Sequence, residues 1–94
     1  KATIAQAGFA RFSEKFAALV QEEMGKRIQS KNRGVKQAGF YVLMGASMPN
    51  VLIELGFISN PSEEKKLKSS NYREVLANSI YRAIEKYEKT LDTN

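Results

Sequence analysis

The chain has 94 residues, enough for one small domain. It contains no cysteine and no histidine. This excludes disulfides, cysteine nucleophiles, Ser-His-Asp triads and metal sites with imidazole or thiolate ligands from these residues. Fifteen basic and ten acidic side chains give a net charge of +5, which suits an anionic partner. We expect no membrane span, because no apolar run approaches ~18 residues, and the first residues lack the apolar core of a signal peptide.

Residues 9–29 are predicted to form an amphipathic helix. Apolar side chains recur there at steps of three, four and seven, which is the spacing of one helical face. They are Phe9, Phe12, Phe16, Leu19, Val20 and Ile28. Two acid–base pairs, Glu22 with Lys26 and Glu23 with Arg27, are spaced for ion pairs across one helical turn.

Two short apolar runs in the middle of the chain are predicted to be strands. Phe40–Leu43 and Val51–Leu55 are rich in β-branched or aromatic residues and are bounded by Gly, Pro or Asn. Residues 44–50 between them are too few for a parallel crossover, so we expect the two strands to pair antiparallel. Both faces of each run are apolar, which is typical of strands covered on two sides.

The last third of the chain is predicted to form two helices. Asn60 can cap a short helix and Glu63 can complete a capping box. A second cap, Asn71 with Glu74, precedes a long amphipathic pattern over residues 71–90.

This inventory predicts an α/β fold. The chain would hold the C-terminal part of a mixed, mainly parallel sheet flanked by helices, with two strands and about three helices of its own. Two strands cannot complete such a sheet. We therefore expect further strands outside this sequence and an exposed apolar surface on these residues.

Glu54 is the most unusual residue, because it lies inside an otherwise apolar run. On a strand it would share a face with Leu52 and lie opposite Ile53. A carboxylate in apolar surroundings requires a cation or hydrogen-bond donors. One hypothesis is a structural ion pair with Arg33 or Lys36. The other is a general base or metal-associated carboxylate near the end of a strand, where α/β sheets form sites.

Two segments carry a resemblance to a known family. Residues 33–43 and 48–61 resemble the C-terminal half of the zinc-dependent N-acetylmuramoyl-L-alanine amidases of the amidase-3 family. The most specific part is the apolar strand with its lone Glu, followed by Gly-Phe-Ile-Ser-Asn-Pro (residues 51–61). The resemblance extends from about Gly8 to Tyr87 and implies that residues 1–94 are the C-terminal half of one amidase-like catalytic domain.

The resemblance implies a peptidoglycan amidase. The family holds one zinc ion with two histidines and a glutamate in its N-terminal half. The zinc-bound water attacks the amide between N-acetylmuramic acid and L-alanine. Glu54 matches the family's general base, and Arg33 stands within the matching phrase as a candidate for binding the substrate's carboxylates. The implied substrate is peptidoglycan or muropeptides, and the implied location is the cell envelope, either periplasmic or extracellular.

The absence of histidine departs from the family pattern. No metal ligand is expected in this chain, so the N-terminal half must lie outside it, in cis or in another chain, and these residues alone should be inactive. One alternative is a non-catalytic interaction module derived from the amidase fold. Another is a small basic nucleic-acid-binding domain that uses residues 26–36. Nucleic acid is not expected, because no RNA-recognition, KH or helix-turn-helix signature is present.

Overall fold

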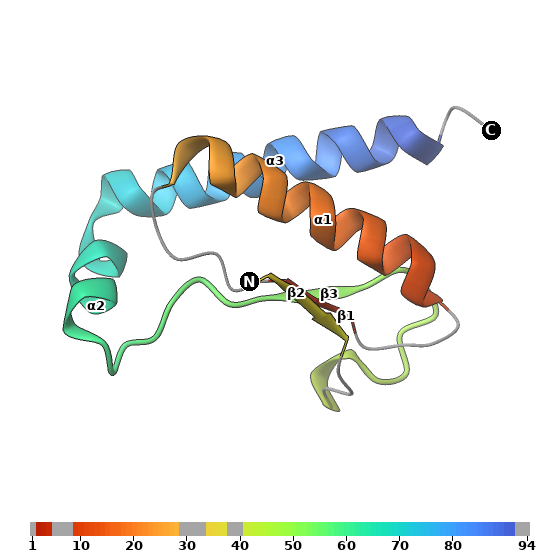
Figure 1. Ribbon diagram of the computed structural model, residues 1–94, viewed down its shortest axis with the longest axis horizontal. Helices are drawn as coiled ribbons and strands as arrows, with labels where there is room; N and C mark the ends of the chain where they lie inside the picture. Colours follow the sequence, from red (N-terminus) through yellow and green to blue (C-terminus); the bar gives the residue numbers. More distant parts are fainter. Residues whose placement is uncertain (1, 5–8, 29–33, 38–40, 92–94) are drawn as a thin grey trace.

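The fold is a small sheet with two long helices on one side of it (Figure 1). The computed structural model describes residues 2–4, 9–28, 34–37 and 41–91. In chain order the elements are β1 (Ala2–Ile4), α1 (Ala10–Arg27), β2 (Val35–Gln37), the 3-10 helix η2 (Tyr41–Leu43), β3 (Val51–Ile53), α2 (Pro61–Lys68) and α3 (Ser70–Leu91).

The sheet is mixed, with the strand order β2-β1-β3. The central strand β1 pairs in parallel with β2, where Ala2 lies opposite Val35. It pairs antiparallel with β3, where Ala2 lies opposite Ile53. The α/β class is therefore present. Among the described residues the sheet has three strands instead of the expected two, with one parallel and one antiparallel pair.

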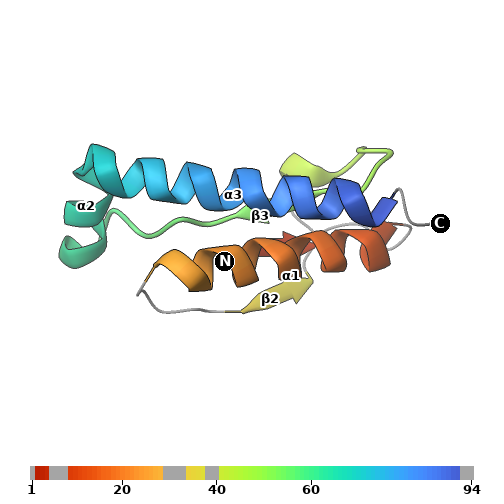
Figure 2. The ribbon, with the colours of Figure 1, turned by 90° about the horizontal axis from the view of Figure 1, so that it is seen from above.

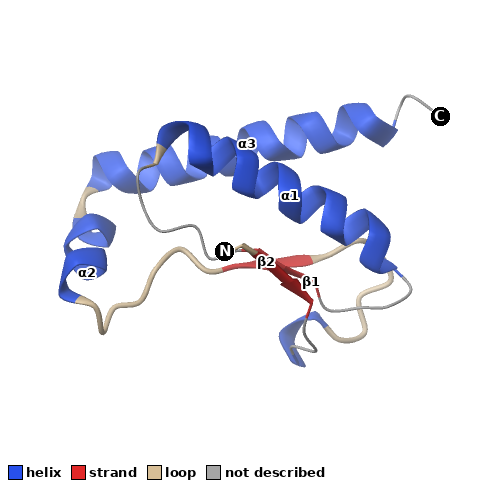
Figure 3. Ribbon diagram, in the orientation of Figure 1, coloured by secondary structure: helices blue, strands red, loops and turns tan. Residues whose placement is uncertain are grey.

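The prediction that residues 40–43 and 51–55 form neighbouring antiparallel strands is wrong. Tyr41–Leu43 is the 3-10 helix η2, and Phe40 lies outside the described residues (Figure 3). Strand β3 pairs with β1, which takes the place beside β3 that was predicted for residues 40–43. Strand β3 itself ends at Ile53, so Glu54 lies just beyond the strand.

The face of α1 that packs on the sheet is lined by small side chains. Ala17 is fully buried and contacts Val35 and Val51 of the sheet. The buried positions of α1 are Ser13, Ala17, Val20 and Glu23. The buried face of α1 is therefore rotated about the helix axis relative to the apolar face predicted from the sequence. Phe12, which belongs to the predicted face, is 47% exposed. Small residues on this face allow the helix backbone to approach the strands closely.

Helix α3 runs beside α1 on the same side of the sheet (Figure 2). Its buried positions are Leu76, Ser79 and Ala83, spaced three and four residues apart. The predicted long amphipathic helix is thus confirmed, and α3 packs on α1 and α2.

The start of α2 is capped as predicted. The Asn60 side-chain oxygen accepts hydrogen bonds from the backbone N–H of Ser62 (3.0 Å) and Glu63 (3.2 Å). The Glu63 side chain, however, accepts from Phe57 N.

The predicted cap of the last helix is wrong by two residues. The Ser69 hydroxyl oxygen accepts from Tyr72 N at 3.3 Å, and α3 already begins at Ser70. Asn71 lies inside the first turn. The reason is that Ser69 immediately follows α2 and caps the next helix directly, so no linker is needed.

Large apolar side chains remain exposed over several parts of the chain, as an incomplete sheet predicts. They are Phe12, Val42, Met44, Met48, Leu55, Phe57, Ile58, Tyr81, Ile84 and Leu91. Within the described residues, no α-helix covers the face of the sheet opposite α1 and α3 (Figure 1). Over the same residues, no helix is long and apolar enough to cross a membrane.

Candidate active site

Glu54 is the first residue after β3 and is half-buried. One oxygen of its carboxylate, Oε2, is shielded from solvent. Because β3 runs antiparallel to β1, this end of the sheet carries the amino ends of the parallel strands β1 and β2. The rule that sites form at the carboxyl ends of parallel strands therefore does not explain the position of Glu54. Its position has to be explained by the contacts of the segments on either side of it.

The segment that leads into β3 is held by α1. The hydroxyl oxygen of Ser13 accepts a hydrogen bond from Asn50 N at 2.8 Å. Ser13 is fully buried, so this bond lies where water competes poorly. The next residue, Val51, contacts Ala17 one turn further along α1. These two contacts hold the start of β3 against α1, at the third and fourth residues before Glu54.

The segment that follows Glu54 lies against α2. Gly56 has a φ of +152°, a conformation that side-chain-bearing residues rarely adopt. A Cβ at Gly56 would lie 3.4 Å from Leu67 Cδ1 and 3.5 Å from Glu63 Cβ. Next to it, Phe57 N donates to Glu63 Oε2 at 2.9 Å. Glu54 therefore lies between a segment held by α1 and a segment held by α2.

The second predicted site residue, Arg33, lies outside the described residues. Its neighbour Gly34 precedes β2, and the Gly34 carbonyl oxygen accepts from Gln21 Nε2 at 2.8 Å. The strand register places Gly34 and Glu54 at the same end of the sheet, with β1 between their strands. Lys36, the other cation proposed for Glu54, lies in β2.

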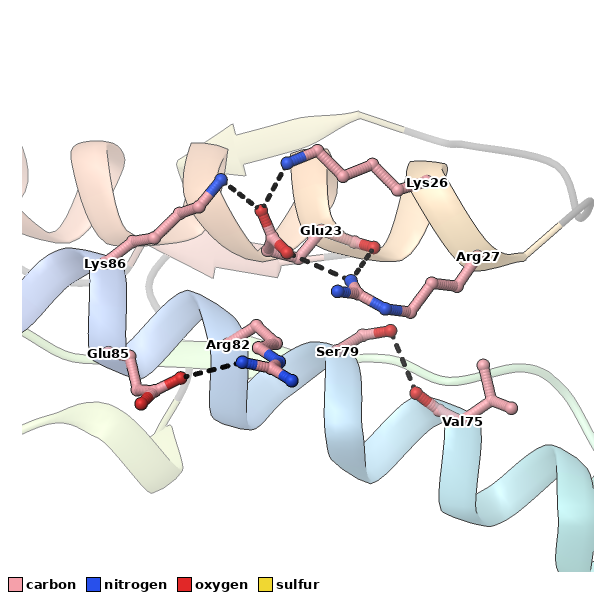
Figure 4. Close-up of polar contacts among 8 residues, drawn as sticks. All are labelled: Glu23, Lys26, Arg27, Val75, Ser79, Arg82, Glu85 and Lys86. Carbon is pink, nitrogen blue, oxygen red and sulfur yellow. Dashed lines mark hydrogen bonds and ion pairs between the residues drawn. The ribbon is translucent and has the colours of Figure 1, made fainter.

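A second carboxylate, Glu23, forms the best-connected ionic cluster of the described residues (Figure 4). Its side chain is 2% exposed and contacts Lys86 Nζ of α3 at 2.6 Å, Lys26 Nζ at 2.9 Å and Arg27 Nη1 at 3.0 Å. The hydrogen bonds from Lys86, and then those from Lys26 and Arg27, lower the pKa of Glu23 to about 2. The bond to Glu23 also raises the pKa of Lys86.

This cluster was only half predicted from sequence. The Glu23–Arg27 pair is confirmed, but Lys26 contacts Glu23 and not the expected Glu22. The contact with Lys86 joins two helices far apart in the sequence, so no local spacing could reveal it. A carboxylate that stays ionised with three bound cations is a poor proton acceptor, so we assign Glu23 a structural role.

The family model for N-acetylmuramoyl-L-alanine amidase matches residues 3–86. The chain belongs to the amidase-3 family. The amidase AmiC of Neisseria meningitidis is 40% identical over 85% of this chain. The alignment covers 19% of that protein, so its length greatly exceeds that of the chain.

Two solved structures of N-acetylmuramoyl-L-alanine amidases share this fold. The enzyme AmiC2 of Nostoc punctiforme is 32% identical, with a TM-score of 0.80 over 94% of this chain and 47% of its own length. The enzyme of Clostridium difficile is 29% identical, with a TM-score of 0.84 over 100% of this chain and 50% of its own length. The chain thus spans about half the length of these two amidases.

The residues of this chain do not fit a zinc site of the kind implied by the family resemblance. The sequence has no histidine or cysteine. No group of three or more carboxylates gathers among the described residues in a way that could hold a metal ion. Glu54 is therefore not part of a set of three metal ligands within the described residues.

An open apolar pocket of about 360 Å³ lies between the start of α1 and the end of α3. Its lining residues are Phe9, Phe12, Phe16, Pro49, Tyr87 and Leu91. The rings of Phe16 and Tyr87 lie 5.0 Å apart between centroids, so Tyr87 packs against α1. Glu54 does not line this pocket, so the candidate catalytic group lies elsewhere.

Proposed function

We propose that the chain is the C-terminal half of the catalytic domain of a peptidoglycan amidase. The complete domain would hydrolyse the amide between N-acetylmuramic acid and L-alanine. Membership of the amidase-3 family carries this proposal, because the matched region, residues 3–86, includes Glu54 and its flanking phrase. The similarity of the fold to two solved amidases supports it further.

Glu54 is proposed as the general base. In this role its carboxylate takes a proton from the attacking water and delivers it to the amine of L-alanine as the amide bond breaks. Its position between two anchored segments supports the proposal, because a general base must be held at hydrogen-bond distance from the proton it transfers. Arg33 is proposed to bind the carboxylates of the peptide by means of its planar guanidinium.

Zinc is proposed as the cofactor on the basis of the family resemblance, with its ligands outside these 94 residues. The other half of the domain, in cis or from another chain, is the proposed source of those ligands. The proposed partner is peptidoglycan or a muropeptide in the cell envelope, on the periplasmic or extracellular side. The net charge of +5 is compatible with an anionic wall polymer.

The test is Glu54→Gln in the complete domain, meaning these residues together with the other half. Glutamine keeps the shape of the side chain but removes its basicity, so we expect the rate of muropeptide amide cleavage to fall by ~10²–10⁴-fold. The melting temperature and bound zinc should stay close to those of the unaltered domain. Cleavage is measured by release of the stem peptide, and folding by thermal melting.

The matched control is Glu64→Gln. Glu64 lies in the first turn of α2 and is paired with Lys68 at 3.5 Å, so this variant removes a charge without touching the Glu54 segment. We expect it to cleave normally. Near-normal cleavage by a folded, zinc-loaded Glu54→Gln domain would remove Glu54 from the mechanism. Absence of cleavage by the unaltered complete domain would instead favour the alternative of a non-catalytic module.

A further inference from the structure

The loop that connects Glu54 to α2 is not fixed by hydrophobic burial. Leu55 and Phe57 are each 42% exposed and Ile58 is 74% exposed. A segment with exposed apolar side chains gains little from packing and opens readily unless other contacts hold it. The path of the chain just after the proposed base must therefore depend on specific polar and close backbone contacts.

Those contacts come from the first turn of α2. Both backbone groups of Phe57 are bound there, since its N–H donates to Glu63 Oε2 at 2.9 Å and its carbonyl oxygen accepts from Asn60 N at 3.0 Å. Asn60 is itself tied to the helix through its cap bonds to Ser62 N and Glu63 N. The Glu63 bond comes from a side chain, so it can be removed by substitution.

The backbone also passes close to Glu63 at the preceding residue. A Cβ built at Gly56 would lie at an ordinary van der Waals distance, 3.5 Å, from Glu63 Cβ, which places this residue beside Glu63. The same glycine adopts a φ of +152°. Glu63 therefore lies beside Gly56 and binds the next residue, Phe57, by a charge-assisted hydrogen bond.

We propose that Glu63 is a positioning residue for Glu54. This inference rests on the proposed role of Glu54 as general base. Upstream of Glu54, the Ser13–Asn50 hydrogen bond holds the entry to β3. Downstream, the Glu63–Phe57 hydrogen bond holds the loop three residues after Glu54. Loss of the downstream anchor lets the Glu54 carboxylate drift, and a displacement of about 1 Å can cost a reaction ~10²-fold.

The test compares three variants of the complete, zinc-loaded domain. Glu63→Ala removes the acceptor, and we expect kcat for muropeptide cleavage to fall ~10–100-fold with little change in KM, because the base is displaced while binding is retained. Glu63→Gln keeps an oxygen that can accept from Phe57 N and should restore most of kcat. Glu64→Ala removes an acid from the same helical turn, and should behave as the unaltered domain.

A second readout does not depend on activity. Amide hydrogen exchange at Phe57 should accelerate about tenfold or more in Glu63→Ala, and should stay near the unaltered rate in Glu63→Gln and Glu64→Ala. Unchanged amide exchange at Phe57 in Glu63→Ala would show that the Glu63 side chain does not hold this loop in place. Faster exchange with unchanged kcat would overturn its role in positioning.

Failure of the proposed function is recognised separately. It would appear as normal cleavage by Glu54→Gln, or as no cleavage by the unaltered domain. In either case Glu63 would have no base to position, and the proposal would be overturned together with the function. If Glu54→Gln is inactive while Glu63→Ala cleaves normally, the function stands and only the positioning role is overturned.

Discussion

A single buried hydroxyl determines where the strand before Glu54 begins. Ser13 lies on the face of α1 that packs on the sheet and is fully buried, with its oxygen 2.8 Å from Asn50 N. Serine is a modest helix former, so propensity alone does not favour it here. Its value lies in being small enough for close packing while still accepting a hydrogen bond from the incoming strand.

Ser13→Ala in the complete domain should lower the free energy of unfolding by about 1–3 kcal/mol, because it removes the hydrogen-bond acceptor of Asn50 N. Denaturant unfolding measures this. Ser62→Ala is the control, because Ser62 is exposed on α2 and its loss should change stability by less than about 0.5 kcal/mol. Equal stability of the two variants would show that the buried hydroxyl contributes nothing specific.

At the level of elements, the contact between α1 and α3 combines small side chains with one ionic cluster. Ser79 and Ala83 present little volume on α3, which brings the two helices close together. Glu23 of α1 then binds Lys86 of α3 directly (Figure 4). Glu23 is the buried member of this cluster and its cations are partly exposed, so removal of Lys86 would take from the buried carboxylate its one partner on α3 among the described residues.

The stability contributed by Glu23 should depend on pH. Its pKa is lowered from 4.5 to about 2 in the folded state, so its contribution is complete above pH 4.5 and is lost as the pH falls towards 2. Glu23→Gln should melt at a lower temperature than the unaltered domain at pH 7, and the difference should shrink between pH 4.5 and 2. Thermal melts across this range measure it.

The control for this series is Glu22→Gln. Glu22 is the adjacent acid of α1 and is exposed, so its replacement should shift the melting temperature little at any pH. A difference between Glu23→Gln and the unaltered domain that stays constant down to pH 2 would contradict the lowered pKa of Glu23.

At the level of the whole molecule, the described residues expose many large apolar side chains. Both long helices lie on one side of the sheet, and large apolar side chains are exposed on α1, on α3 and in the segments that flank β3. The similar solved structures are about twice as long. We infer that the other half of the domain covers part of this apolar surface.

The 94 residues expressed alone should therefore be oligomeric, aggregation-prone or loosely folded, and should release no stem peptide from muropeptides above the uncatalysed background. Size-exclusion chromatography with light scattering, thermal melting and a cleavage assay test this, with the complete domain as the reference. A monodisperse monomer that melts cooperatively would contradict the prediction about the surface, and cleavage by the fragment would contradict its proposed inactivity.

The sequence predicted the helices well and the sheet poorly, for a physical reason. Helices α1 and α3 span 18 and 22 residues, long enough for the helical period to appear in the pattern. Strands β1 and β2 have three residues each, too few to establish an alternation. The sequence pattern consequently predicts residues 40–43, and not β1, as the neighbour of β3.

The residues of the candidate site were also only partly predictable from the sequence. Glu54 was found because a charged residue interrupts an apolar run, which is a local signal. The anchors Ser13 and Glu63 reach this segment through contacts that follow from the packing of α1 and α2 against it. Glu63 was noticed only as a capping residue. The role of Arg33 stays a prediction.

The position of β1 at the very start of these residues has a consequence for the order of folding. Ala2 must meet both Val35 and Ile53, so every pairing in the sheet closes a long loop, whereas α1, α2 and α3 need only near neighbours. Contacts so distant along the chain form slowly, because the entropy of loop closure is lost before any pairing compensates for it. During synthesis β1 emerges long before β3, so this three-stranded part of the sheet cannot form until the segment that leads to Glu54 is available.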